Sequence, residues 1–270
     1  MHIKPEGKAH YYDPVNGYPC HQVPYADAKR ADEMRSTTLA DARKLGLVPG
    51  VTGICSEWAR PGLEAWKLSQ MAEAAATCPR LPDEPDTSWW RRVATDGREA
   101  AMVAAEKGTR IHKAIARWLA GEAPLSAGDL DICGVVNNYQ KWHAQNITEV
   151  KKSECSFASH RGYGGTVDLV ARYRGEISVI DFKTKNTKQG GKIIAPDDWG
   201  LQLVAYAEGL DLFGVNLINV ILSRSESGRI EVKIWDNHQE LLALFNCCLC
   251  LWRRRNRYDP RETLSTKGVR

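Results

Sequence analysis

The sequence contains no uninterrupted apolar run of about 18 residues, the length that a membrane-spanning helix requires. A conventional membrane helix is therefore excluded, and we expect no membrane partner. The chain also lacks internal repeats and low-complexity segments, which excludes an array of repeated units. What remains is the pattern of an ordinary globular protein, because 43% of the residues are hydrophobic and 26% are charged.

Residues 1–5 lack the apolar stretch of a secretory signal peptide, so we expect the protein to remain in the cytoplasm. Eight cysteines without an export signal are then expected to be reduced thiols. The length of 270 residues permits one large domain, or a core that carries a helical appendage.

Positive charge gathers at the C-terminal end of the chain. The formal net charge is +4, yet residues 251–270 hold seven Lys or Arg against two Asp or Glu. A basic end on a near-neutral body could attract a polyanion. The alternative is a solvated, frayed end without a partner.

Changes of pattern divide the chain into four segments. Residues 1–37 are expected to form an irregular arm, residues 38–86 a helical N-terminal region, residues 87–258 the core, and residues 259–270 a basic tail. Helical periodicity predicts helices at about 28–46, 61–77, 87–120 and 126–145.

Within the core the hydrophobic period changes from helical to alternating. Segments rich in Val, Ile and Tyr predict three antiparallel strands, at about 150–159, 163–173 and 176–183. After a loop at about 184–197, a helix is expected that Asp197 or Asp198 caps. Two more strands and a last helix are expected at about 215–223, 229–235 and 237–255. The sequence therefore predicts an α/β protein with a mixed sheet flanked by helices.

Two of these strands carry charged residues that suggest chemistry. Asp181 and Lys183 are two residues apart, so their side chains share one face of a strand, while Ile180 and Phe182 point to the other. Asp168 ends the run Gly-Gly-Thr-Val-Asp on the neighbouring strand. Two carboxylates and an ammonium that converge are costly unless a divalent cation joins them. The arrangement suits metal-assisted hydrolysis of a phosphodiester.

Four short motifs follow one another along the core. They are Gly-Thr-x-x-His ending at His112, Gly-Gly-Thr-Val-Asp ending at Asp168, Asp-Phe-Lys at 181–183, and Gln-x-x-x-Tyr from Gln202 to Tyr206. In this order they resemble the signatures of the RecB-like branch of the PD-(D/E)xK nuclease superfamily, over about residues 38–255. The segment 47–54, with Pro61 and Trp66 after it, resembles the N-terminal region of phage-type recombination exonucleases in that branch. The resemblance implies a restriction-endonuclease-like core with the order α-β-β-β-α-β.

The resemblance also implies a metal site. Asp168 and Asp181 would be hard oxygen ligands for one or two ions of Mg²⁺ or Mn²⁺. The backbone carbonyl of Phe182 could complete the coordination. His112 would add an imidazole, which favours tolerance of Mn²⁺.

Three further residues are expected to act beside the metal. Lys183 would hold or help deprotonate the attacking water and neutralise charge on the phosphorus. Gln202 and Tyr206 lie one helical turn apart and would position Lys183 or the scissile phosphate.

Candidate DNA contacts lie near the first motif, on the loop and further upstream. The Trp-Trp-Arg-Arg run at 89–92 combines stacking surface with positive charge, as single-strand DNA channels do. Core packing is the alternative role for its tryptophans. The expected contacts are Trp90, Arg91, Thr109, Arg110, Thr184, Lys185, Lys188 and Lys192.

Each catalytic candidate has an ordinary structural interpretation as well. His112 could be a packed or surface histidine, and Asp181 and Lys183 a surface ion pair. Asp168 could cap a turn after the glycines, while Gln202 and Tyr206 could belong to a plain helix surface.

The cysteines allow a second kind of cofactor to be considered. Some RecB-like nucleases bind an iron–sulfur cluster through one upstream cysteine and three near the C-terminus. Here Cys247, Cys248 and Cys250 follow Cys55 and Cys78, but no cysteine follows Cys250. An apolar stripe on the last helix takes cysteines as small hydrophobic residues, so we expect no cluster.

These observations predict a metal-dependent deoxyribonuclease, an exonuclease of the phage-recombination or end-processing type. Its partner would be DNA with a free end, with a single-strand annealing or recombination protein as a further candidate. The alternatives are a CRISPR-adaptation-type nuclease and a catalytically inactive DNA-end-binding protein. The resemblance implies a bacterial or phage-infected host cell, and the oligomeric state is left open.

Overall fold

The centre of the computed structural model is a five-stranded mixed sheet. The structure describes residues 9–25, 33–226 and 228–262. In spatial order the strands are β5 (Ile147–Ser159), β6 (Tyr163–Tyr173), β7 (Glu176–Lys185), β8 (Asn216–Ser223) and β9 (Ile230–Trp235). Neighbouring strands are antiparallel except for β7 and β8, which run parallel.

The connections explain this topology. Arg174 and Gly175 join β6 to β7, and both have positive φ (51° and 93°), as a two-residue type I′ hairpin turn requires. Parallel strands need a long crossover, and α6 (Asp197–Gly209) provides it between β7 and β8.

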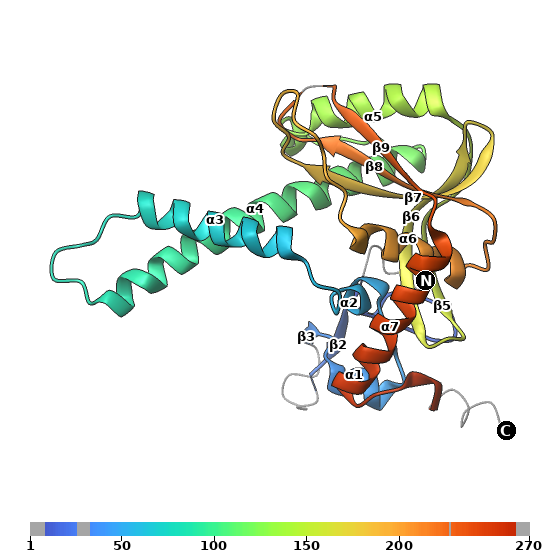
Figure 1. Cartoon of the computed structure of the whole chain (residues 1–270), viewed down its shortest axis with the longest axis horizontal. Coiled ribbons are helices and arrows are strands. Elements are labelled where there is room, and N and C mark those ends of the chain that lie inside the picture. The colour runs from blue at the N-terminus through green and yellow to red at the C-terminus, as the bar shows by residue number, and fades with distance from the viewer. Residues whose placement is uncertain (1–8, 26–32, 227, 263–270) are drawn as a thin grey trace.

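Helices cover both faces of the sheet (Figure 1). On one face α4 (Asp86–Leu119) and α5 (Cys133–Asn146) pack Ile111, Ile115 and Val136 onto Leu169 and Ile180. On the other, α6, α7 (His238–Asn256) and the short α2 (Val51–Cys55) form a second core. The expected mixed α/β architecture is therefore confirmed.

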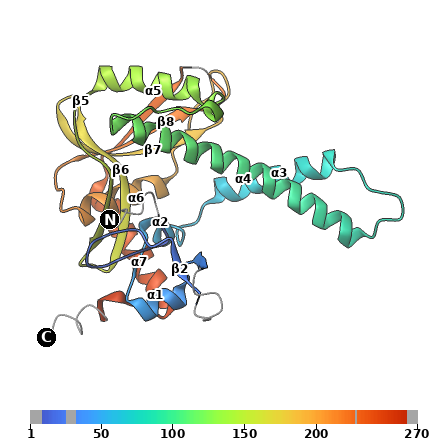
Figure 2. The ribbon, with the colours of Figure 1, turned by 180° about the vertical axis from the view of Figure 1, so that it is seen from behind.

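A long helical hairpin projects from this body. It consists of α3 (Pro61–Thr77) and the first half of α4, and both views show it extending away from the sheet (Figures 1 and 2). Its small core contains Ala74, Cys78 and Val93, and the indole of Trp89 donates a hydrogen bond to the Cys78 carbonyl at 2.9 Å.

The N-terminal residues are more ordered than expected. β1 (Tyr11–Tyr12) pairs with β4 (Val48–Pro49), and β2 (Gln22–Pro24) pairs with β3 (Met34–Ser36). Tyr12 is buried, and its hydroxyl lies 3.2 Å from Thr166 Oγ1 on β6. A Cβ at Gly164 would lie 2.7 Å from the Tyr12 Cβ, so glycine is required where this segment docks.

One expected helix start and one expected helix cap are wrong. The helix expected at about 28–46 is only α1 (Leu39–Leu45), because Thr38 and Asp41 form a capping box; residues 28–32 lie outside the described residues. Neither Asp197 nor Asp198 caps α6. Pro196 occupies that position without a side-chain hydrogen bond.

The other elements agree closely with expectation. The helices expected at about 61–77 and 87–120 are α3 and α4, and the strands are shifted by three residues at most. The helix expected at about 126–145 begins later, at Cys133, after a single 3₁₀ turn at Ala127–Asp129. None of the helices in the described part of the chain is both long and apolar enough to cross a membrane.

Candidate active site

The site begins where β6 separates from β7. Among the described residues, the β6–β7 ladder runs from Tyr173–Glu176 to Leu169–Ile180. Val167 packs in one core and Leu169 in the other, although residues two apart on a regular strand share a face. The strand therefore changes direction at Asp168. At this point the Phe182 N–H has a side-chain partner instead of a backbone carbonyl of β6. It donates a hydrogen bond to the Asp168 carboxylate at 2.8 Å.

Asp181 and Lys183 form a buried ion pair beside this split. The Asp181 carboxylate is fully buried, and the Lys183 ammonium lies 2.6 Å from its Oδ2. Asn219 on β8 donates to the same oxygen at 3.2 Å. The Trp235 indole donates to Asn219 Oδ1 at 2.9 Å and so sets the orientation of that amide. The surface-pair interpretation of Asp181 and Lys183 is therefore wrong.

Asn219 is a site residue that the motif analysis missed. It stands on a strand of otherwise apolar residues, Leu217 to Leu222, and is fully buried. A buried amide within such a run needs a polar partner, and this is the signal that could have revealed it.

Two residues of α6 hold Lys183 from the other side. The Lys183 ammonium donates to Gln202 Oε1 at 2.7 Å, and Gln202 Nε2 donates to the Tyr206 hydroxyl at 2.6 Å. Tyr206 fits here because residue 165 is a glycine, whose added Cβ would lie 2.7 Å from the tyrosine ring. Gln202 and Tyr206 are both buried, so they are not part of a plain helix surface.

His112 approaches the split from α4, on the other face of the sheet. Its Nδ1 lies 3.5 Å from Asp168 Oδ2, and its ring meets the Phe182 ring edge-on with centroids 5.9 Å apart. One turn earlier, a Cβ at Gly108 would lie 2.8 Å from Thr184 Oγ1. The glycine of the Gly-Thr-x-x-His motif thus allows α4 to approach the end of β7.

The Phe182 carbonyl points to the edge of β7 that contacts Asp168. In a strand the N–H and C=O of one residue point to the same edge, and the Phe182 N–H points to Asp168. Oxygen donors from two carboxylates and a carbonyl, with an imidazole beside them, fit the chemistry of Mg²⁺ or Mn²⁺. No group of three or more His, Cys, Asp or Glu side chains is gathered as a metal site in residues 9–25, 33–226 and 228–262.

Two of the expected DNA contacts, Thr184 and Lys185, are the last residues of β7 and adjoin Lys183. Lys185 extends over the Trp199 ring, 5.5 Å from its centroid, and Lys183 lies over the same ring at 5.6 Å. Thr184 is half-buried on the opposite face of the strand, next to Gly108 of α4, whereas Lys188 and Lys192 are exposed on the loop.

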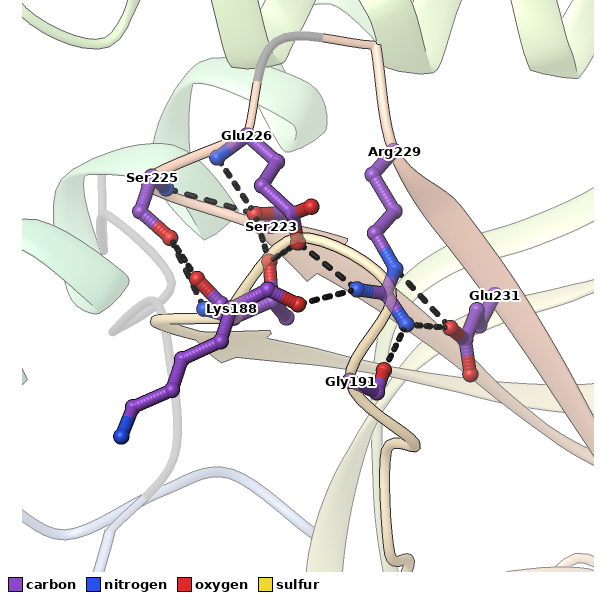
Figure 3. A network of polar contacts seen from close by, with 8 residues as sticks. Lys188, Gly191, Ser223, Ser225, Glu226, Arg229 and Glu231 are labelled. Carbon is purple, nitrogen blue, oxygen red and sulfur yellow. Dashed lines mark hydrogen bonds and ion pairs between the residues drawn. The ribbon is translucent and has the colours of Figure 1, made fainter.

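That loop is held to the β8–β9 turn by a polar network (Figure 3). Arg229 donates to the Lys188 carbonyl at 3.1 Å and also to the Gly191 carbonyl. The Thr187 N–H donates to Ser225 Oγ at 2.8 Å. The Lys188 side chain extends away from this network (Figure 3).

The remaining expected contacts are either distant from the site or already engaged by other residues of the protein. Trp90 and Arg91 are exposed in the projecting hairpin, and at 1.5 Å per residue they lie roughly 30 Å along α4 from His112. Arg110 is engaged by Asp129 at 3.0 Å and by Asp131 at 2.6 Å. Thr109 Oγ1 donates to the Ala105 carbonyl within its own helix at 3.1 Å.

Asp198 is a second neighbour of Lys183 that was not expected. Its Oδ2 lies 2.9 Å from Arg60 Nε, which joins α6 to the base of α3. Burial raises the pKa of Asp198, while the charges of Arg60 and Lys183 oppose that rise. Lys183 thus pairs with one carboxylate on its own strand and interacts electrostatically with a second on α6.

The cysteines near α7 differ in exposure. Cys55 and Cys248 are buried, and burial raises the pKa of each thiol, with each also affected by a nearby cysteine. Cys247 and Cys250 are exposed.

Comparison with known proteins adds little to this geometry. No protein-family model matches the chain, and no curated protein matches it. One similar solved structure, described as the crystal structure of SSO0001, is 14% identical and has a TM-score of 0.26. The match covers 71% of this chain and 87% of that one.

Proposed function

We propose that the protein is a metal-dependent deoxyribonuclease with a PD-(D/E)xK core, acting as an exonuclease in phage-type DNA recombination or end processing. One observation carries the proposal: where two strands separate, Asp168 binds the Phe182 N–H between Asp181 and Lys183, which pair with each other, and Gln202 holds the lysine. An ion pair with only a structural role would not need a second carboxylate bound to the N–H of the residue between its two members.

Asp168, Asp181, the Phe182 carbonyl and His112 would hold one or two ions of Mg²⁺ or Mn²⁺. When bound, the cation supplies Lewis-acid stabilisation of the phosphate charge. Lys183 would orient the attacking water and stabilise negative charge as it develops on the phosphoryl oxygens. The Gln202–Tyr206 pair would keep the ammonium directed at that position.

The test is the digestion of end-labelled single- and double-stranded DNA with Mg²⁺, Mn²⁺, Ca²⁺ or excess EDTA. We expect cleavage from ends with Mn²⁺ at least as good as Mg²⁺, binding without turnover in Ca²⁺, and no cleavage in EDTA. Hydrolysis that persists in excess EDTA would rule the mechanism out.

Variants separate catalysis from binding. Lys183→Ala should abolish cleavage but still bind DNA, whereas Lys152→Ala, on the far edge strand β5, should behave as wild type. Asp168→Asn keeps an acceptor for the Phe182 N–H, so it should fold normally yet lose Mn²⁺ binding in calorimetry. If wild type binds DNA ends but cleaves nothing under any of these conditions, the protein is an end-binding protein.

A further inference from the structure

A groove lies one strand away from Lys183, on the same face of the sheet. Its volume is about 450 Å³, and its lining includes Ile221 of β8, Lys233 of β9 and residues 192–195 of the loop. Ile221 is the direct partner of Lys183 in the β7–β8 ladder. Lys233 is the partner of Asn219, which itself pairs with Asp181. Directly paired residues present their side chains on one face, with neighbouring strands about 4.8 Å apart.

The lining combines aliphatic surface with positive charge. Ile193 and Ile194 line the groove from the loop side, and Ile194 is 70% exposed. Two lysines, Lys192 and Lys233, also line the groove, and the Lys233 ammonium lies over the Trp235 ring, 4.8 Å from its centroid. The lining also contains one acidic residue, Glu231, which accepts a hydrogen bond from Arg229 Nε at 2.9 Å; the same arginine also pairs with Glu226 at 2.7 Å.

The loop wall of the groove is held in place at both ends. At one end Arg229 binds the carbonyls of Lys188 and Gly191 (Figure 3). At the other, Lys185 donates to the Ile194 carbonyl at 3.0 Å, next to Trp199. A wall that is already ordered loses little conformational entropy when a ligand binds.

We propose that this groove binds an unpaired nucleotide of the DNA strand whose phosphate lies at Lys183. The inference rests on the proposed nuclease function and deepens it by naming the substrate as single-stranded or frayed DNA. An aliphatic wall suits the face of a base, and the two ammonium groups suit its phosphate. A volume of about 450 Å³ lies in the range of small-ligand pockets, roughly 300–1,000 Å³, which fits a nucleotide and excludes a duplex.

The test measures binding of a fluorescein-labelled single-stranded oligonucleotide and of a blunt duplex, both in EDTA, over a range of salt. Ile194→Ser should weaken single-strand binding by roughly five- to a hundredfold without changing the salt slope. Lys233→Gln should weaken it and also reduce the slope by about one, because one phosphate contact is lost. Neither variant should change duplex binding more than about twofold.

Two matched controls keep the result specific. Lys152→Gln changes a lysine on the opposite edge strand, and Val15→Ser changes an aliphatic residue that is 91% exposed. Both should bind as wild type. Equal losses for single strand and duplex, no loss in either groove variant, or no binding of the single strand by wild type would overturn the groove assignment.

The outcomes separate this inference from the proposed function. If wild type cleaves DNA and both groove variants bind DNA as wild type does, the assignment of nucleotide binding to the groove is wrong and the nuclease assignment is retained. If the groove variants lose single-strand affinity as expected while wild type cleaves no DNA with any metal, the nuclease assignment is wrong and the groove assignment is retained.

Discussion

At the scale of single residues, the site depends on how one buried carboxylate is compensated. Asp181 is removed from solvent, which is costly for a charged group unless it is paired and hydrogen-bonded. Lys183 supplies the charge and Asn219 supplies a hydrogen bond. Lys183 is in turn shared with Gln202, so the ammonium lies between the strand and α6 and is held on both sides.

Gln202 and Tyr206 can only orient groups, since neither side chain is a good base near neutral pH. We expect Gln202→Ala and Tyr206→Phe to lower the single-turnover cleavage rate by roughly ten- to a thousandfold, the range for a lost transition-state hydrogen bond. Mn²⁺ binding should be nearly intact. Tyr163→Phe is the matched control, because Tyr163 is equally buried but donates to the Ala205 carbonyl instead. Equal rates in all three variants would refute the positioning role.

At the scale of elements, the loop after β7 combines a fixed backbone with exposed lysines. Arg229 binds the carbonyls of Lys188 and Gly191 and so fixes the loop backbone. The exposed ammonium groups of Lys188 and Lys192 therefore extend from a fixed backbone. This arrangement predicts phosphate contacts whose strength depends on salt.

Neutralising Lys185, Lys188 and Lys192 to Gln should reduce the slope of log affinity against log salt by about two to three, because each lost phosphate contact removes roughly 0.7–0.9. The measurement is anisotropy with labelled DNA between low and moderate salt. The control neutralises Lys141, Lys151 and Lys152, which are exposed on α5 and β5. The loop assignment fails if both triple variants change the slope equally.

The tip of the projecting hairpin depends on one carboxylate. Arg92 binds both oxygens of Glu84, at 2.8 and 2.6 Å, and the Leu81 N–H donates to it as well. The Arg92 hydrogen bonds, more than any other contact, lower the pKa of Glu84 from 4.5 to about 2. Because the pKa of Glu84 is lower in the folded state, the Glu84 carboxylate stabilises the folded tip fully above about pH 4.5. This stabilisation of the tip is lost as the pH falls toward 2.

We therefore expect backbone hydrogen exchange at residues 79–89 to become faster in wild type, relative to its intrinsic rate, as the pH falls below about 4.5. Glu84→Gln should show faster exchange there than wild type at neutral pH, and no such pH dependence. Glu73→Gln, on the exposed surface of α3, serves as the control. A pH dependence that persists in Glu84→Gln would contradict this account of the tip.

At the scale of the whole molecule, the C-terminal end of the chain is more integrated than its charge suggests. Arg253 and Arg255 belong to α7, where Arg253 donates to the Arg161 carbonyl and Arg255 pairs with Glu57. Tyr258 donates to the carbonyls of Ala42 and Leu47, which joins this end to the N-terminal region. Much of the positive charge expected in a tail is thus part of the folded body.

Removal of residues 263–270, which lie outside the described residues, tests what this part of the expected basic tail contributes. The salt slope of DNA binding should fall by at most about two, since only Lys267 and Arg270 are lost. Tyr258→Phe, in contrast, should cost about 1 kcal/mol of unfolding free energy for its hydrogen bonds. A truncated protein that unfolds at a lower temperature would show that residues 263–270 contribute to stability.

The sequence by itself determined the order of most elements and the central members of the site. Asp181 and Lys183 share a face because strands repeat every two residues, and Gln202 and Tyr206 share one because helices repeat at about four. These relations are local, so spacing alone predicts them. The glycines at 108 and 165 were part of the motifs, but their reason, room for Thr184 and Tyr206, became visible only in three dimensions.

Only the tertiary structure decided which distant residues meet. Asn219 and Lys233 reach the site through strand register, and Trp199 through the packing of α6. Arg110 lies close to His112 in sequence, but Asp129 and Asp131 engage it. Trp90 lies far out on the same helix as His112. Contacts between segments distant in sequence depend on how the whole sheet is paired and covered, and no local spacing encodes that choice.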